Sequence, residues 1–442
     1  MATTTLTSPA AIGRPRWAAT TVAPIALWTG LVLAGHLLAA RLVAADPLVH
    51  IGAPPLVGHF DVRVAWPLIA AIVLACGALA YGFRLAEQLR WRSLLITSWV
   101  AGSAWIVTLA AGAGGGLAAL AAPLQTRYEY LAAVPDVAGT GAAGFVRGFV
   151  EALPGYPTHV RGHPPGMVLL LSLLDHAGLG GAGWAAALVI GAGAAAAPAA
   201  LVTMRALAGA RAARRAAPFV TLAPAAVWLG TSADALFCGT LAIGIALLAV
   251  AGTMTARRRR VDAVALLAGL VLGAGLLLSY GLAPLGLVAV AVALATRAWR
   301  ALALACAGVA AVVVAFGAAG FWWPEGLRAT HALYDSGVAA RRPYLDFLVI
   351  SPAAFALVIG PAVFVGLARL RDRRAWILPA GALAALAVAE LSGLSKGETE
   401  RIWLPFAPWL LLATAALRAP RRWLAAQLAL AIALQAAVRS PW

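Results

Sequence analysis

The sequence predicts an all-α fold: a polytopic transmembrane helical bundle of about 13 crossings, with a large extracytoplasmic loop that carries short amphipathic helices. Three observations support this prediction. Of the 442 residues, 63% are hydrophobic and only 11% are charged, and the mean hydropathy is +0.90, values far outside the range of soluble globular proteins. Apolar runs of about spanning length recur along the whole chain. One long polar stretch, residues 125–167, interrupts them.

The apolar runs give the expected crossings in chain order. The first run follows Arg14 and Arg16 and is too long for the core of a signal peptide, so it predicts a signal anchor. The runs lie near residues 22–45, 64–82, 94–112, 183–204, 217–231, 235–253, 262–280, 283–296, 301–322, 347–368, 376–392, 403–417 and 423–438. Residues 164–179 are also apolar, but a full crossing there would separate Arg257 to Arg260 from the other basic clusters. We therefore expect a half-helix or re-entrant segment that protein shields from lipid.

Basic residues determine the expected orientation in the lipid bilayer. Arginine clusters between the runs, with the two N-terminal arginines, hold 22 of the 33 basic residues and fall on one face, which the positive-inside rule makes cytoplasmic. The net charge of +17 therefore reflects topology and does not indicate nucleic acid as a partner. The Ala, Arg, Gly and Leu bias is typical of GC-rich bacterial genes. We expect a multi-pass protein of the bacterial plasma membrane with a cytoplasmic N-terminus and an extracytoplasmic active site.

The chain is expected to form a single membrane domain over residues 1–442. The sequence shows no internal repeat, phosphate-binding loop, HExxH motif or soluble domain large enough for a nucleotide, which argues against ATP-driven transport. Cys76, Cys238 and Cys306 all lie in apolar runs, so they predict neither disulfides nor a thiolate metal site.

The polar stretch QTRYEYLAAVPDVAGTGAAGFVRGFVEALPGYPTHVRGHPPGM is where we expect chemistry, because a simple connection between two helices needs far fewer residues. Glu129 is the first candidate for a catalytic base; its simpler role would be a solvated carboxylate paired with Arg127. Asp61, in GHFDVRVAW at the start of the second crossing, is the second candidate. Its simpler role would be an ion pair with Arg63.

The motifs from Arg127 onward resemble, in their order, those of the GT-C superfamily of integral-membrane glycosyltransferases, especially its protein O-mannosyltransferase and aminoarabinose-transferase branch. The first outer loop of these enzymes has an acidic pair and a tyrosine, an amphipathic stretch and a Pro-Pro element that opens a helix. The corresponding stretches here are RYEYLAAV, GFVRGFVEAL and RGHPPGMVLLLSLLDHAGLGG. RALAGARAARRAAPFVTLAPAAVWLGTSADALF is similar to an arginine-rich turn and a helix ending in a Pro-Asp-like element, with Asp234 at the aspartate. SKGETERIWLPFAPWLLL resembles the superfamily's Leu-Pro-x-x-Pro helix start.

The resemblance covers roughly residues 95–417 and suggests a division of the chain. The expected parts are two additional N-terminal helices (1–92), a GT-C-like module (93–417) with its outer loop at 113–165, and a terminal helix (418–442). The N-terminal helices have no counterpart in the superfamily's pattern. Its Asp-Glu pair is Tyr128-Glu129 here, so the role of the first acid would pass to Glu129 or elsewhere.

The resemblance implies an enzyme that takes a sugar from a polyprenyl-phosphate donor and transfers it to a glycan, lipid or protein acceptor on the outer face. Such a transfer needs a base for the acceptor hydroxyl and positive charge or a metal ion at the departing phosphate. The catalytic candidates are Glu129 and Asp61, and the substrate-binding candidates are Arg127, Tyr128, Arg161, His163, Asp234, Arg341, Lys396 and Arg401. A divalent metal ion stays open as a cofactor, with unknown ligands.

Other interpretations remain open at this point. A transporter or flippase of lipid-linked sugars would be favoured by repeats and by charges near helix centres. A glycan polymerase or ligase could use a similar arginine-bearing outer loop. Among single residues, Arg401 could simply pair with Glu398 or Glu400 at the surface, and His163 could belong to a purely structural Pro-Pro turn.

Overall fold

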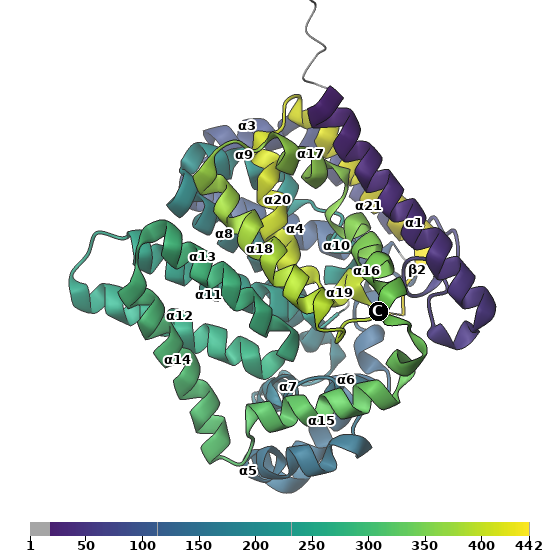
Figure 1. Ribbon diagram of the computed structural model, residues 1–442, viewed down its shortest axis with the longest axis vertical. Coiled ribbons are helices and arrows are strands. Elements are labelled where there is room, and N and C mark those ends of the chain that lie inside the picture. Colours follow the sequence, from purple (N-terminus) through teal and green to yellow (C-terminus); the bar gives the residue numbers. More distant parts are fainter. Residues whose placement is uncertain (1–17, 113, 231, 442) are drawn as a thin grey trace, which may run out of the picture.

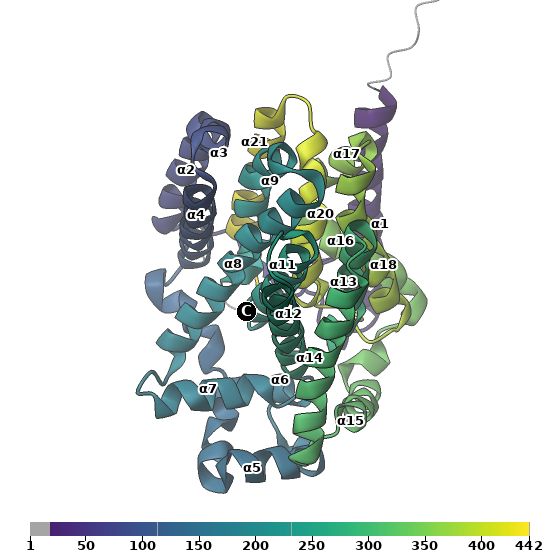
Figure 2. The ribbon, with the colours of Figure 1, turned by 90° about the vertical axis from the view of Figure 1, so that its left-hand side faces the viewer.

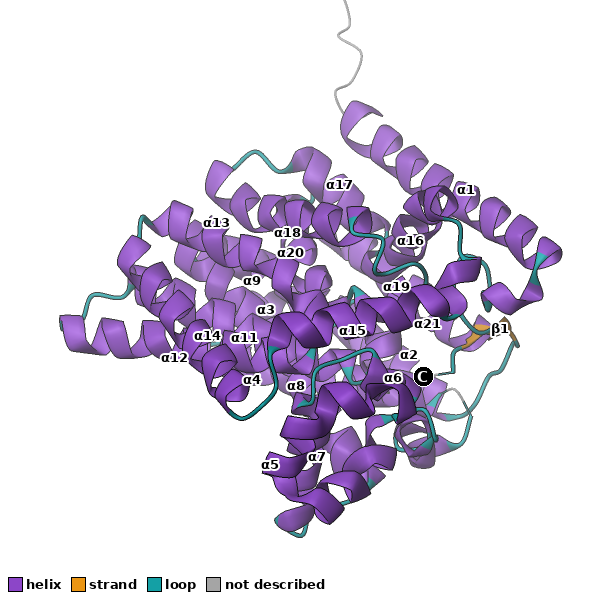
Figure 3. Ribbon diagram, turned by 60° about the horizontal axis from the view of Figure 1, so that its bottom comes forward, coloured by secondary structure: helices purple, strands orange, loops and turns teal. Residues whose placement is uncertain are grey.

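The computed structural model describes residues 18–112, 114–230 and 232–441, and 81% of the residues are helical. The expected all-α class is confirmed. The described residues contain one small antiparallel sheet, in which β1 (His59–Phe60) pairs with β2 (Val438–Arg439). Figure 3 shows β1 beside the C-terminal end of the chain, so segments from the two ends of the sequence meet there.

Eight helices of the described residues are long and apolar enough to cross a membrane, which supports a multi-pass membrane protein. They are α1 (Ala23–Ala45), the stretch Pro67–Gln88 with α2 (Pro67–Gly77) and α3 (Phe83–Gln88), α4 (Trp91–Ala111), α8 (Ala182–Ala208), α11 (Asp234–Thr253), α12 (Arg258–Leu278), α14 (Trp299–Ala318) and α18 (Arg373–Leu391). A ninth would be the pair α16 (Tyr344–Ile359) and α17 (Pro361–Arg369), bent by 89° at Gly360.

The expected count of about 13 crossings is not confirmed, because several apolar runs form short or broken helices. Run 217–231 contains the end of α9 (Ala210–Thr221), a break and α10 (Ala226–Leu229). Run 403–417 is almost entirely buried and forms α20 (Ala407–Leu411) between two 3₁₀ turns, Leu404–Phe406 and Leu412–Ala416. Irregular backbone of this kind is tolerated at membrane depth when protein surrounds it. Three further helices of the bundle are α13 (Gly286–Thr296), α19 (Thr399–Ile402) and α21 (Pro420–Ala437).

Short helices form a separate layer at one end of the bundle, roughly across the long helices (Figures 1 and 2). This end layer comprises α5 (Val134–Ala152), α6 (Thr158–Arg161), α7 (Gly166–His176) and α15 (Trp323–Ser336), with 3₁₀ turns Gly116–Leu120, Pro123–Gln125, Tyr130–Ala133 and Leu153–Gly155. Helix α5 buries Phe145 and Phe149, and Phe149 lies edge-on to Phe321, with 5.6 Å between ring centroids. An apolar stripe thus attaches the layer to the bundle.

Helix α7 occupies the place where the half-helix was expected, and it is too short to cross a membrane. Pro164 and Pro165 immediately precede it, and Pro fits the start of a helix because it lacks a backbone N–H. A Cβ on Gly166 would collide with the backbone carbonyl of Leu277 at the end of α12. The glycine therefore allows the start of α7 to approach α12 closely.

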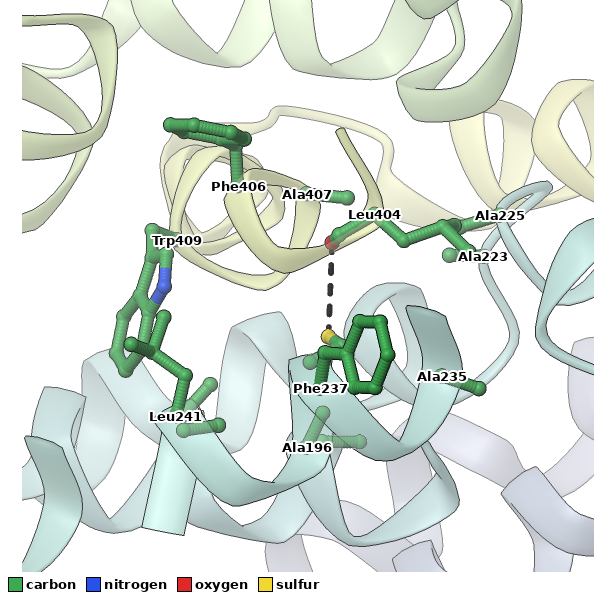
Figure 4. Packing of buried hydrophobic residues seen from close by; sticks show 14 of the residues in the cluster. Ala196, Ala223, Ala225, Ala235, Phe237, Leu241, Leu404, Phe406, Ala407 and Trp409 are labelled. Atoms are coloured by element: carbon green, nitrogen blue, oxygen red, sulfur yellow. Dashed lines mark hydrogen bonds between the residues drawn. The ribbon is translucent and has the colours of Figure 1, made fainter. Parts of the chain in front are cut away.

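Small residues also bring α8 and α11 together in the centre of the bundle. A Cβ on Gly239 would collide with the carbonyl oxygen of Ala192, so the two helix backbones touch at this point. On the other side of α11 lies the segment that begins at Leu404, whose carbonyl oxygen accepts a hydrogen bond from the Cys238 thiol at 3.5 Å (Figure 4). This packing fixes the start of α11 relative to residues 396–411.

Candidate active site

Five charged or titratable side chains from distant parts of the sequence meet where the end layer contacts the bundle. This charged cluster consists of Glu129, His159, Asp234, Glu398 and Arg401. Glu129 and His159 belong to the end layer, whereas Asp234 is the first residue of α11 and the other two lie in or next to α19. The cluster therefore joins three segments that are far apart in the chain.

Arg401 is the centre of the charged cluster, and only 5% of its surface is exposed. Its Nη1 donates to Oδ2 of Asp234 at 2.6 Å, and its Nη2 donates to Glu398 and to Nε2 of His159, the latter at 3.2 Å. Burial acts to lower the pKa of Arg401, but Asp234 and Glu398 outweigh it and raise this pKa above its usual range. The guanidinium is thus a paired charge.

Glu129 and His159 form a hydrogen-bonded pair in the end layer. The distance from Nδ1 of His159 to Oε1 of Glu129 is 2.7 Å. Because Nε2 of His159 accepts from Arg401, the imidazole proton is assigned to Nδ1, which donates it to Glu129. The second carboxylate oxygen, Oε2 of Glu129, is buried and has no hydrogen-bond partner among the described residues. A buried carboxylate oxygen without a partner is unusual in a folded protein and marks Glu129 as a candidate for function.

Asp234 is held by Ser232, which lies just before α11, as well as by Arg401. The hydroxyl of Ser232 donates to Oδ2 of Asp234 at 2.6 Å, and the backbone N–H of Asp234 donates back to that hydroxyl oxygen at 3.2 Å. A carboxylate at the first residue of a helix is also stabilised by the helix dipole. These contacts leave Asp234 little rotational freedom.

The aromatic rings of His163 and Tyr130 lie beside the charged cluster. Nδ1 of His163 donates to the backbone carbonyl of His159 at 2.8 Å, and its ring centroid lies 5.7 Å from that of Tyr130 and 5.4 Å from that of Phe237. Burial lowers the pKa of His163 to about 4 and, with the charges of Asp234 and Glu129, raises the pKa of Tyr130. Both rings are therefore neutral near pH 7, and His163 can accept a hydrogen bond at Nε2 but cannot neutralise a phosphate.

Arg127, Tyr128 and Arg161 lie at the rim of the cluster. Arg127 is exposed and donates to the hydroxyl of Tyr128 at 2.8 Å, and the carbonyl of Tyr128 accepts from the N–H of His159 at 3.0 Å. The guanidinium of Arg161 lies 3.5 Å from the hydroxyl of Thr158. In the described residues neither arginine forms an ion pair, so both positive charges face neutral partners.

The structure does not bring Asp61 or Arg341 to the charged cluster. Asp61 pairs with Arg63 at 2.6 Å, which is the simpler role considered for it above, and Arg341 pairs with Asp46 at 2.9 Å. Lys396 lies close to the cluster along the chain, but its ammonium faces the ring of Tyr334, with 5.9 Å to the centroid.

The structure places four residues in or beside the charged cluster that were not among the candidate site residues. His159 and Glu398 belong to the charged cluster, and Arg342 and Glu400 are buried charged residues next to it. All four lie in polar stretches of the sequence, and this position is the feature from which the sequence could have indicated them. The sequence does not show that Arg342 and Glu400 are buried, because Val49 and Val57, the backbone partners of their side chains, are distant in the chain.

The described residues contain no group of three or more His, Cys, Asp or Glu side chains arranged to hold a metal ion. Comparisons with known proteins found no match for this chain, whether among family models, curated proteins or solved structures.

Proposed function

We propose that this protein is a membrane glycosyltransferase that takes a sugar from a polyprenyl-phosphate donor on the outer face and transfers it to an envelope glycan, lipid or protein. The observation that supports this most is the buried carboxylate of Glu129. His159 holds one of its oxygens, and the other has no partner among the described residues. An oxygen without a partner, on a carboxylate whose direction is fixed by a histidine, supports the role of general base.

In the proposed reaction, Oε2 of Glu129 takes the proton of the acceptor hydroxyl. The acceptor oxygen forms a bond to the anomeric carbon, and the bond between that carbon and the phosphate oxygen breaks. The phosphate leaves with the bonding electron pair, so charge moves from Glu129 to the leaving group. The His159 N–H stabilises the carboxylate and fixes its direction, because Arg401 holds the other side of the imidazole.

The departing phosphate needs positive charge. Arg401 was expected to bind it, but both terminal nitrogens of Arg401 already contact carboxylates. We therefore assign Arg401 a positioning role and place the phosphate near Arg127 and Arg161. Within the part of the chain that the structure describes, these two arginines contact neutral partners at the rim of the cluster and form no ion pair.

A transporter or flippase of lipid-linked sugars is the second candidate. The buried ion pair of Arg401 and Asp234 favours it, since paired charges within a helical membrane protein often lie on transport pathways. A glycan polymerase or ligase would differ from the transferase only in its acceptor.

The test is an analysis of lipid-linked sugars and envelope glycans in a deletion strain, complemented with the wild-type chain or with Glu129→Gln. A transferase predicts accumulation of one polyprenyl-phosphate sugar, accessible from outside, and loss of one terminal sugar from a glycan. If the accumulated lipid-linked sugar is protected from an impermeant reagent, it lies on the cytoplasmic side, which would indicate a flippase. Accumulation of complete lipid-linked oligosaccharides would indicate a polymerase or ligase. Unchanged lipid-linked sugars would rule out all three.

A further inference from the structure

The segment that carries Glu398 and Arg401 has an unusual backbone. Gly397 and Glu398 are consecutive residues in the left-handed region, with φ values of 86° and 61°. A non-glycine residue rarely adopts this conformation, and it persists only where the surroundings hold it. We call residues 396–401 the site turn, because their conformation decides where Glu398 and Arg401 lie in the charged cluster.

Arg342 holds the site turn from one side, although it is only 5% exposed. Its Nη1 donates to the carbonyl of Lys396 at 2.6 Å, and its Nε donates to the carbonyl of Val49 at 3.1 Å. A Cβ on Gly397 would lie 2.6 Å from Nη1 of Arg342. The glycine thus leaves room for the guanidinium, which joins the site turn to the loop after α1.

Glu400 holds the site turn from within it. The side chain is completely buried, and its Oε1 accepts the backbone N–H of Val57 at 2.9 Å. Oε2 has no hydrogen-bond partner among the described residues. Burying a charged group costs free energy unless bonds compensate for it. For Arg342 and Glu400 alike, part of the compensation comes from the backbone of one loop, residues 46–66.

The loop of residues 46–66, here called the first loop, is itself firmly held. His36 on α1 contacts the carbonyl of Pro54 at 2.8 Å, and β1 pairs with β2 at the other end of the chain. The N–H groups of Asp61 and Arg63 donate to carbonyls at the end of α21, at 3.0 and 2.8 Å. A segment fixed at so many points can support the site turn.

We propose that the first loop is a positioning element of the active site, clamped to the site turn by Arg342 and Glu400. Loss of either clamp loosens the first loop locally, at residues 49–57 between its other anchors, and lets Glu398 and Arg401 move out of register with Asp234 and His159. The N-terminal helices, which lie outside the GT-C resemblance, then belong to the working unit of the enzyme. The clamp is independent of the proposed function; only its effect on turnover rests on sugar transfer.

The clamp is tested by thiol labelling of the purified full chain in detergent. Cys76, Cys238 and Cys306 are replaced by alanine, and Leu56, which is only 2% exposed, is changed to cysteine as the reporter. Glu400→Ala and Arg342→Ala are each expected to raise the labelling rate of this cysteine about tenfold, because each variant loses one hydrogen bond to the first loop, worth about 1.4 kcal/mol.

Two controls make the result specific to the clamp. Glu400→Gln keeps an oxygen that accepts the Val57 N–H, so labelling should stay within about twofold of the parent. Arg328→Ala, at an exposed arginine of α15, should have no effect. Cleavage by trypsin after the exposed Arg63 is a second measure that needs no reporter cysteine, and it should accelerate in the same two variants. Unchanged labelling and unchanged cleavage in Glu400→Ala would overturn the proposal.

Sugar transfer gives a separate readout. The clamp variants should lose kcat about tenfold with little change in the KM of the acceptor, and Glu400→Gln should keep activity. A loop that opens while kcat is unchanged would overturn the positioning role. If the wild type transfers no sugar from any polyprenyl phosphate, the proposed function fails, and the labelling and cleavage rates alone decide the clamp.

Discussion

Arg401 and Asp234 are 167 positions apart in the sequence, yet Nη1 of Arg401 lies 2.6 Å from Oδ2 of Asp234, and both side chains are almost completely buried. This ion pair joins the site turn to the start of α11. Because it is shielded from water, loss of one partner would leave the other charge uncompensated, which typically costs about 3–5 kcal/mol. The pair therefore couples the geometry of the charged cluster to the stability of the fold.

The first prediction follows from this pair. Arg401→Ala should lower the free energy of unfolding by about 3–5 kcal/mol, because Asp234 and Glu398 lose their counter-charge. Arg401→Lys should restore only part of this, since one ammonium cannot reproduce the fork of a guanidinium. The measurement is chemical unfolding in detergent.

Arg341→Ala is the matched control for Arg401. Its ion pair with Asp46 is half exposed, so its loss should lower the free energy of unfolding far less than the loss of Arg401 does. If Arg401→Ala proved as stable as Arg341→Ala, the buried network would not contribute to the fold as the structure implies.

The sequence predicted part of this site for a physical reason. Glu129 stands out in the polar stretch, and His163, Asp234 and Arg401 stand just before apolar runs. The structure brings all four together. Asp61 and Arg341 have the same local signature but lie elsewhere. Only the packing of distant helices separates the two groups, and the sequence carries no direct record of it.

The fold, like the site, was predicted only in part: its helical class was predictable from the sequence, but the number of crossings was not. Hydropathy correctly indicates an apolar helical protein, but it does not distinguish a helix that faces lipid from one that is buried in protein. Run 403–417 has the composition of a crossing, yet Pro405 and Pro408 interrupt it and almost all of it is buried. The crossing count was therefore the least secure part of the prediction.

The second prediction concerns the proposed base. Glu129→Gln should reduce sugar transfer by about 10²-fold or more while leaving folding and donor binding largely intact, because the amide keeps the shape of the side chain but cannot take the proton. The measurement is single-turnover transfer by the purified variant.

Glu151→Gln serves as the control for Glu129, since Glu151 is an exposed carboxylate of α5 outside the charged cluster. It should transfer sugar at the wild-type rate. Normal turnover by Glu129→Gln together with an inactive Asp61→Asn would instead move the base to the first loop.

The third prediction concerns the orientation of the end layer. Thr140 lies in α5, and Val338 follows α15, whereas Ala256 lies between α11 and α12 at the other end of α11. In intact cells, an impermeant thiol reagent should label cysteines at Thr140 and Val338 and should reach Ala256 only after permeabilisation. Labelling of the Thr140 position only after permeabilisation would place the charged cluster on the cytoplasmic side and exclude an outer-face transferase.

The last prediction concerns stability and pH. Burial lowers the pKa of His163 from 6.5 to about 4, so the folded chain binds fewer protons than the unfolded chain between these values, and stability falls as the pH is lowered through them. Burial raises the pKa of Glu400 from 4.5 to about 7, so stability falls as the pH is raised through that window. Each pKa difference corresponds to about 3 kcal/mol. The two effects oppose each other between about pH 4.5 and 6.5.

Single variants should separate the contributions of His163 and Glu400 to the pH dependence of stability. Glu400→Gln removes the acidic titration, so the free energy of unfolding should rise with pH from about 4 to 6.5. His163→Asn keeps a donor for the His159 carbonyl but removes the basic titration, so the free energy of unfolding should fall with pH from about 4.5 to 7. Glu129, His159, Asp234, Glu398 and Arg401, the charged groups near these two residues, are present in both variants. The difference between the two unfolding curves therefore isolates His163 and Glu400, and parallel curves would show that neither group has the pKa that its burial implies.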